Sequence, residues 1–126
     1  ADSELAYTTL AFPALRQFRP ELVLISAGFD AHVDDPLGGM RVSAPYFGRL
    51  TREIASLADD CCDGRVVAVT EGGYDLKGLA DSLRVTLRAL AGGPQRPEES
   101  APAGPAPRGG GTIRAVRPHV AGTWKL

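Results

Sequence analysis

The sequence predicts an α/β fold in which helices flank a parallel sheet. Two short apolar runs, 22–26 (LVLIS) and 65–70 (RVVAVT), are typical of strands covered on both faces. A segment of helical periodicity separates them, which makes a βαβ unit with parallel strands and a right-handed crossover. Two strands are few for a parallel sheet, and this indicates that the chain is part of a larger fold.

The elements before the second strand follow from local signals. Residues 3–18 are expected to form a helix that ends at Arg19, because the residue before Pro20 avoids the α region; Pro13 weakens the continuity of this helix. A long loop with three glycines and three aspartates covers 26–40. Ser43 is the expected N-cap of a helix over 44–61, which has one apolar stripe.

The second half contains one more helix and a region unsuited to a core. Asp63 and Gly64 predict a turn, and Asp75 is the expected N-cap of a helix that runs to residue 91 and stops at Gly92. Residues 92–111 hold 6 Gly and 5 Pro, so they are expected to be flexible. We therefore divide the chain into a compact segment, 1–93, a Gly/Pro-rich loop, 94–111, and a tail, 112–126.

Composition excludes some classes of function. With 14 basic and 15 acidic residues, the chain carries no excess of positive charge for nucleic acid, and no nucleic-acid partner is expected. No run approaches the roughly 18 apolar residues of a membrane span, so no membrane partner is expected either. The adjacent Cys61 and Cys62 are expected to be reduced thiols at a helix end, which favours a cytoplasmic location.

The loops after the two strands are where chemistry is expected. Ligands bind at the carboxyl ends of strands in open α/β sheets, and Asp30 and Tyr74 follow the first and second strand. A carboxylate and a phenol at one edge can serve as a metal ligand and as a hydrogen-bond donor to an oxyanion. The alternatives are that Asp30 only caps its loop and that Tyr74 is a packed aromatic ring with a hydrated hydroxyl group.

Other residues in these loops also have two interpretations. Gly72 and Gly73 allow either a tight turn or a close approach of the backbone to a ligand. His32 is an acceptable zinc ligand, but a zinc site needs three protein ligands, so we expect a surface or supporting position for it. Asp34 is interpreted as a turn residue, and Asp35 as one that orders the loop through backbone amides.

Two longer motifs give a more specific signal. Residues 20–39 (PELVLISAGFDAHVDDPLGG) and 65–76 (RVVAVTEGGYDL) closely resemble the zinc-dependent histone deacetylase family, nearest to its bacterial class II-like deacetylases, acetoin utilisation proteins and acetylpolyamine amidohydrolases. The resemblance covers roughly residues 5–93, and a weaker similarity continues in the tail. It implies part of an arginase/deacetylase-type parallel sheet with flanking helices.

The resemblance also implies roles for particular residues. Asp30 would be one ligand of a catalytic Zn²⁺, and Tyr74 would donate a hydrogen bond to the substrate carbonyl. Gly72 and Gly73 would border the substrate tunnel, and Leu37 would line its apolar wall. His32 matches a position that the family does not use as a metal ligand.

The remaining parts of such a site are expected outside this chain. The family's Asp-x-His zinc motif and its tandem histidines lie upstream of the matched region, so we expect a C-terminal part of a deacetylase that can pair with a missing N-terminal half. The complete parent would hydrolyse N-acetyl amides of protein lysine or polyamines. The alternatives are an inactive remnant that acts only as an association partner and a nucleotide-binding domain, which is disfavoured because neither loop is a phosphate-binding loop.

Overall fold

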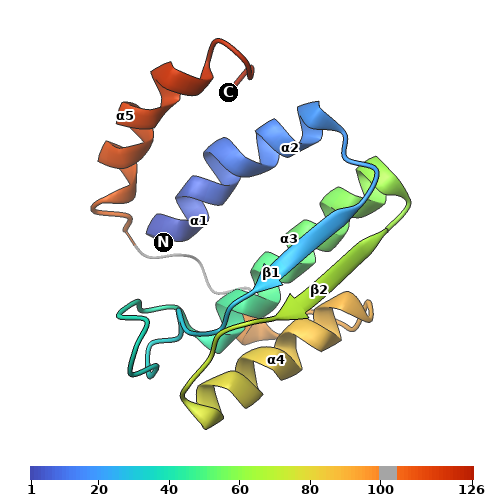
Figure 1. Ribbon diagram of the computed structural model, residues 1–126, viewed down its shortest axis with the longest axis vertical. Helices are drawn as coiled ribbons and strands as arrows, with labels where there is room; N and C mark the ends of the chain where they lie inside the picture. Colours follow the sequence, from blue (N-terminus) through green and yellow to red (C-terminus); the bar gives the residue numbers. More distant parts are fainter. Residues whose placement is uncertain (100–104) are drawn as a thin grey trace. The chain divides into compact units, whose positions relative to one another are not determined.

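The computed structural model of the chain describes residues 1–99 and 105–126 (Figure 1). Its contacts divide these residues into two compact units. One unit consists of residues 1–21 together with 105–126, and the other of residues 22–99. The larger unit contains the sheet and both candidate loops.

The sheet of the larger unit has two parallel strands that lie side by side in Figure 1. Strand β1 (Val23–Ala27) pairs with β2 (Val66–Thr70) from Val23 opposite Val66 to Ala27 opposite Thr70. The helix α3 (Ala44–Cys62) connects them in the sequence, so the βαβ unit and the parallel α/β arrangement are confirmed. This register places the ends of both strands, and the loops that follow, at one edge.

One face of this sheet is exposed. Leu24 is 70% exposed, and Val67 and Val69 are exposed on the same face, because Leu24 lies opposite Val67 and side chains alternate along a strand. The sequence predicted strands covered on both faces. Within residues 22–99, this face is largely open.

Two amphipathic helices pack against each other and form the core of the larger unit. The helices are α3 and α4 (Leu76–Leu90). Their buried apolar side chains are Leu57, Ala58, Cys62, Val85 and Ala89. Helix α3 ends one residue later than expected, where Asp63 adopts a left-handed conformation, and Cys61 and Cys62 are free thiols.

The two predicted N-caps behave differently. Asp75 caps α4 with its side chain, since its Oδ1 accepts a hydrogen bond from the Gly78 N–H at 2.6 Å. Ser43 occupies the N-cap position of α3, as expected, but its side chain makes no capping hydrogen bond. The start of α4 is therefore held by Asp75, directly after Tyr74.

The segment predicted as a flexible loop contains ordered structure. The short 3₁₀ helix η2 (Pro97–Glu99) ends in a carboxylate that is only 1% exposed. Glu99 Oε2 pairs with Arg52 of α3 at 2.8 Å, and Oε1 pairs with Arg88 of α4. Burial raises the pKa of Glu99, but hydrogen bonds from the two guanidinium groups outweigh this and leave the pKa lowered. Composition missed this contact because two distant arginines create it.

The smaller unit begins with a continuous helical stretch, as predicted for 3–18. It comprises α1 (Asp2–Ala6), a π-helical turn η1 (Tyr7–Ala11) and α2 (Phe12–Phe18). The wide turn lies directly before Pro13, whose ring has no N–H and would collide with the preceding turn of a regular α-helix. The Phe12 N–H donates to the Tyr7 carbonyl instead, so the chain continues as a helix through the proline.

The tail forms a helix that begins inside the predicted loop. Helix α5 (Gly109–Val120) starts where the Arg108 and Gly109 N–H groups donate to Asp2 Oδ1 at 3.2 and 2.7 Å. At its other end, the Gln17 side chain forms two hydrogen bonds with the Lys125 backbone. Among the described residues, no helix is long and apolar enough to cross a membrane.

Candidate functional site at the carboxyl edge of the sheet

The backbone holds the two candidate loops against each other. Beyond the paired strands, the Glu71 N–H donates to the Ala27 carbonyl at 3.2 Å, and the Phe29 N–H donates to the Gly72 carbonyl at 2.7 Å. Phe29 is almost fully buried, and its ring packs edge-on against Phe47 of α3 at 5.2 Å. The loops that carry Asp30 and Tyr74 therefore start from one rigid, buried point.

Asp30 lies between two glycines that approach it closely. A Cβ atom on Gly72 would lie 2.6 Å from Asp30 Oδ2 and 2.7 Å from its Cγ. A Cβ atom on Gly38 would lie 1.7 Å from the Asp30 carbonyl oxygen. Gly72 is therefore needed for close approach to the Asp30 carboxylate. Gly73 has a φ of 142°, which a residue with a side chain rarely adopts.

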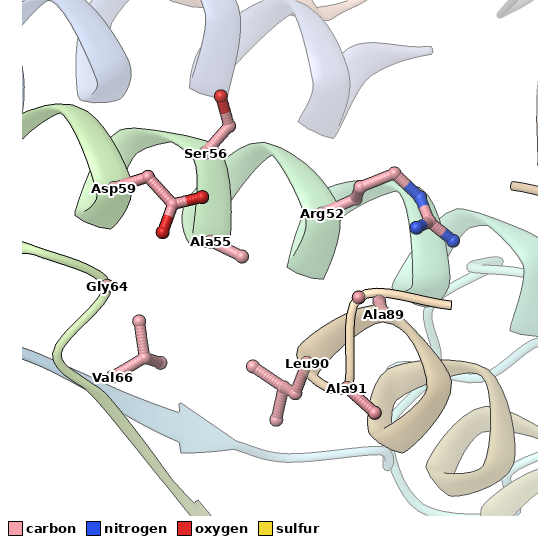
Figure 2. Close-up of a pocket in the computed structure, with 10 residues that line it drawn as sticks. Arg52, Ala55, Ser56, Asp59, Gly64, Val66, Ala89, Leu90 and Ala91 are labelled. Atoms are coloured by element: carbon pink, nitrogen blue, oxygen red, sulfur yellow. The ribbon is translucent and has the colours of Figure 1, made fainter. Parts of the chain in front are cut away.

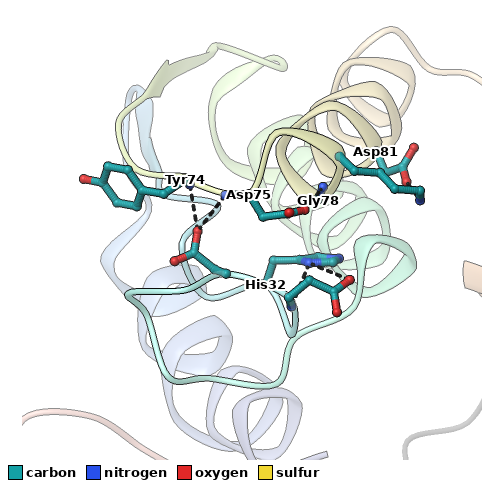
Figure 3. A network of polar contacts seen from close by, with 8 residues as sticks. His32, Tyr74, Asp75, Gly78 and Asp81 are labelled. Atoms are coloured by element: carbon teal, nitrogen blue, oxygen red, sulfur yellow. Dashed lines mark hydrogen bonds and ion pairs between the residues drawn. The ribbon is translucent and has the colours of Figure 1, made fainter.

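Tyr74 and Leu37 extend into solvent at this edge. Tyr74 is 58% exposed, and its ring points away from the polar network drawn in Figure 3. Leu37 is 71% exposed, in the loop after β1. The packed-ring alternative for Tyr74 does not describe a side chain this exposed.

Asp35 connects the two loops. Its Oδ1 accepts hydrogen bonds from the Leu37 and Gly38 N–H groups at 2.9 and 3.0 Å. Its Oδ2 accepts from the Tyr74 N–H at 2.7 Å and, more weakly, from the Asp75 N–H at 3.4 Å (Figure 3). The predicted ordering of its own loop is confirmed. The connection to Tyr74 was missed, because no local pattern reports a contact across 39 residues.

The Asp35 carboxyl group favours its ionised form. Burial raises its pKa, but the hydrogen bonds from the Tyr74, Leu37, Gly38 and Asp75 amides outweigh burial and lower the pKa overall. Asp35 therefore accepts these hydrogen bonds as a carboxylate at neutral pH.

His32 is buried, which excludes the surface position and agrees with the supporting position that was expected as its alternative. It is 7% exposed, and a Cβ atom on Gly78 would lie 2.5 Å from its Nδ1, so His32 packs on the first turn of α4. The same Nδ1 accepts a hydrogen bond from the Asp34 N–H at 3.2 Å. The ring can approach α4 this closely because residue 78 has no side chain.

The residues at this edge offer metal ligands only as separate groups. His32, Asp34 and Asp75 offer ligand atoms within 4.8 Å of one another, but His32 Nδ1 and one Asp75 oxygen already accept backbone hydrogen bonds. Among the described residues, Asp30 belongs to no group of three such ligands. A zinc site needs three protein ligands. The Asp30 carboxylate is a type of ligand that zinc accepts, and two further ligand groups do not accompany it among the described residues.

A pocket of about 540 Å³ lies away from this edge. As Figure 2 shows, its lining includes Arg52, Ser56 and Asp59 of α3, Val66 at the start of β2 and Leu90 at the end of α4. Because the strands are parallel, the start of β2 is the opposite end of the sheet from the candidate loops. The pocket contains none of the candidate residues.

Comparisons with known proteins show which family this chain is similar to. Residues 1–90 match the model of the histone deacetylase domain. The chain is 41% identical over 125 residues to human Polyamine deacetylase HDAC10, covering 99% of this chain and 18% of the relative. It is 38% identical over 86 residues to the chloroplastic Histone deacetylase 14 of Arabidopsis thaliana, covering 68% of this chain and 20% of the relative.

Solved structures agree with this similarity. The HDA15 HD domain superposes with a TM-score of 0.82 at 29% identity, covering 98% of this chain and 32% of that chain. The histone deacetylase Clr3 superposes with a TM-score of 0.83 at 27% identity, covering 98% of this chain and 20% of that chain. The chain thus spans about a fifth of the length of the curated relatives named here.

Proposed function

The chain belongs to the histone deacetylase family, and on that premise we propose that it forms the C-terminal part of a zinc-dependent deacetylase. Residues 1–93 would contribute to its catalytic domain. The observation that carries the proposal is the position of Asp30, held against Gly72 at the carboxyl edge of the sheet, in the loop adjoining Tyr74. The parent protein would hydrolyse the N-acetyl amide of an amine.

Each residue of this edge has a proposed part in that reaction. Asp30 would supply one carboxylate ligand, and a zinc ion held there supplies Lewis acidity and an acidified water molecule. Tyr74 would donate a hydrogen bond to the substrate carbonyl as it becomes an oxyanion. The exposed Leu37 would contact the apolar part of the substrate, and Gly72 with Gly73 would let the substrate pass close to the backbone.

The substrate class follows from the relatives. One is named a polyamine deacetylase and others are named histone deacetylases, which supports an acetylated amine as substrate. Acetyl-lysine in a protein and an acetylpolyamine are the two forms of this chemistry to compare. None of the candidate residues named above is a general base that could activate water. We place this base, together with the remaining zinc ligands, in the N-terminal half. The cytoplasmic location stays a prediction.

Substitution of Tyr74 and Asp30 tests the proposal. In the protein at its full natural length, Tyr74→Phe should lower kcat for an acetyl-lysine or acetylpolyamine reporter by about 10²–10³-fold, the effect of removing one oxyanion donor, with bound zinc unchanged. Asp30→Ala should remove zinc. Tyr7→Phe, in the smaller unit, is the matched control and should leave kcat unchanged. Full activity in Tyr74→Phe would contradict the role of Tyr74.

One observation favours a second candidate function. The open sheet face with Leu24, Val67 and Val69 suits a chain that associates with another polypeptide. Static light scattering on the 126-residue chain tests the association function: a stable monomer argues against it, and an oligomer leaves it open. We expect the chain alone to show no deacetylase activity, and turnover that a chelator abolishes would contradict this.

A further inference from the structure

We propose that Asp35 is a positioning residue, which fixes the Tyr74 main chain relative to Asp30 through a carboxylate bridge between the two loops. The bridge consists of Asp35 and the amides of Leu37, Gly38, Tyr74 and Asp75. This inference rests on the proposed function of Asp30 and Tyr74. It adds a residue that touches neither substrate nor metal.

The two oxygens of Asp35 serve different loops. Oδ1 accepts from Leu37 and Gly38 at 2.9 and 3.0 Å, which turns the loop after β1 back on itself. Oδ2 accepts from Tyr74 at 2.7 Å, in the loop after β2, with Asp75 at 3.4 Å. One buried carboxylate therefore joins segments that are 39 residues apart in the sequence.

These hydrogen bonds close a ring of contacts around Asp30. Gly38, held by Asp35, packs so closely on the Asp30 carbonyl that a Cβ atom would lie 1.7 Å away. Gly72, two residues before Tyr74, packs on the Asp30 carboxylate at a corresponding 2.6 Å. A shift of either loop would therefore move Asp30 relative to Tyr74.

The exposure of Tyr74 explains why the bridge matters. More than half of this side chain is open to solvent, so packing contributes little to its direction. Its position is set mainly by its own main chain, where the Tyr74 amide is held by Asp35 and the preceding Gly73 packs on Phe29 and Leu79. A phenol that must meet an oxyanion within hydrogen-bond distance needs this kind of fixed backbone.

A carboxylate is the side chain that this bridge requires. Four N–H donors point at one residue, and an ionised carboxylate has two oxygens that can accept from all four. Asparagine has the same shape but only one acceptor oxygen, and its NH₂ group would face two N–H donors. Asp35→Asn therefore breaks one side of the bridge with little change in volume.

The test uses the protein at its full natural length and two measurements. The first is hydrogen exchange of the Tyr74 and Leu37 amides, which should become at least about tenfold faster in Asp35→Asn for one or both amides, because a hydrogen bond to a charged acceptor is lost. The second is kcat for an acetyl-lysine reporter, which should fall by about 10–100-fold with bound zinc unchanged. Asp60→Asn removes an exposed carboxylate of α3 and should change neither.

A double-mutant cycle separates positioning from general destabilisation. If Asp35 acts through the Tyr74 hydroxyl group, Asp35→Asn should lower kcat less than about twofold when Tyr74→Phe is already present. Equal, independent losses in both backgrounds would overturn the positioning role. Unchanged exchange of both amides would overturn the bridge itself.

The same experiment distinguishes failure of the underlying function. If the wild-type protein does not deacetylate, the proposed function fails; if Tyr74→Phe retains full activity, the proposed role of Tyr74 fails. The exchange rates of the Tyr74 and Leu37 amides then still decide whether Asp35 joins the two loops.

Discussion

A methyl group added at Gly72 should displace Asp30. In Gly72→Ala the new Cβ atom would lie 2.6 Å from Asp30 Oδ2 and 2.7 Å from its Cγ, whereas ordinary contacts begin at 3.4 Å. The carboxylate must therefore move by about 0.8 Å, the difference between 3.4 and 2.6 Å. Gly38 packs on the Asp30 carbonyl and holds the main chain, so the carboxylate moves by rotating about its side-chain bonds.

This displacement is large on the scale of metal coordination. Ligand distances in metal sites are defined to about 0.2 Å, and a misplacement of about 1 Å in a catalytic group can cost about 10²-fold in rate. We therefore expect Gly72→Ala to weaken zinc binding by at least about tenfold and to lower kcat/KM by about 10²-fold. The fold should persist, because the carboxylate and not the helical core meets the methyl group.

Zinc competition with a chromophoric chelator and deacetylation of an acetyl-lysine reporter measure the two effects in the full-length protein. Gly111→Ala is the matched control, since a Cβ atom there meets nothing within 4 Å and the residue lies in α5. Circular dichroism checks that both variants are folded. If Gly72→Ala binds zinc and turns over substrate as Gly111→Ala does, the contact between Gly72 and Asp30 does not position a ligand.

Three further predictions concern stability and association. Asp75→Ala removes the cap on the Gly78 amide and should lower the free energy of unfolding by about 1 kcal/mol in urea titrations, with Asp75→Asn retaining most of it. Glu99→Gln breaks the buried pairs with Arg52 and Arg88 and should cost about 3 kcal/mol at pH 7. Because the pKa of Glu99 is lowered in the folded state, the ion pairs stabilise the fold above the ordinary carboxyl pKa, and this stabilisation is lost as pH falls through the lowered pKa. The difference in unfolding free energy between wild type and Glu99→Gln should therefore shrink in acid. A difference that stays constant with pH would contradict the ion pairs. The 126-residue chain should form concentration-dependent assemblies in light scattering through its open sheet face, and Leu24→Lys should reduce them.

Local patterns were sufficient to predict most elements. The apolar runs placed both strands, the 3.6-residue periodicity placed α3 and α4, and Asp75 was identified as the cap of α4. The rule that ligands bind at the carboxyl ends of parallel strands predicts Asp30 and Tyr74 at one edge. Each of these signals depends on residues close together in the sequence or on a general rule of topology.

Local patterns failed where a distant residue decides the structure. The Gly/Pro-rich segment was predicted as a loop, yet Arg52 and Arg88 order Glu99, and Asp2 caps α5 from more than 100 residues away. Composition describes how easily a segment folds alone, and it contains no information about a partner charge elsewhere in the chain.

Three features follow from sequence patterns alone: the βαβ unit, the edge that carries Asp30 and Tyr74, and the resemblance to one family of hydrolases. Three other features come from tertiary contacts: the burial of His32, the close approach of Gly72 to the Asp30 carboxylate, and the bridge that Asp35 makes between the two loops. Strands and helices can be predicted because they follow from short-range periodicity and backbone preference. Hydrogen bonds and close contacts between loops depend instead on where folding brings residues that the sequence keeps far apart.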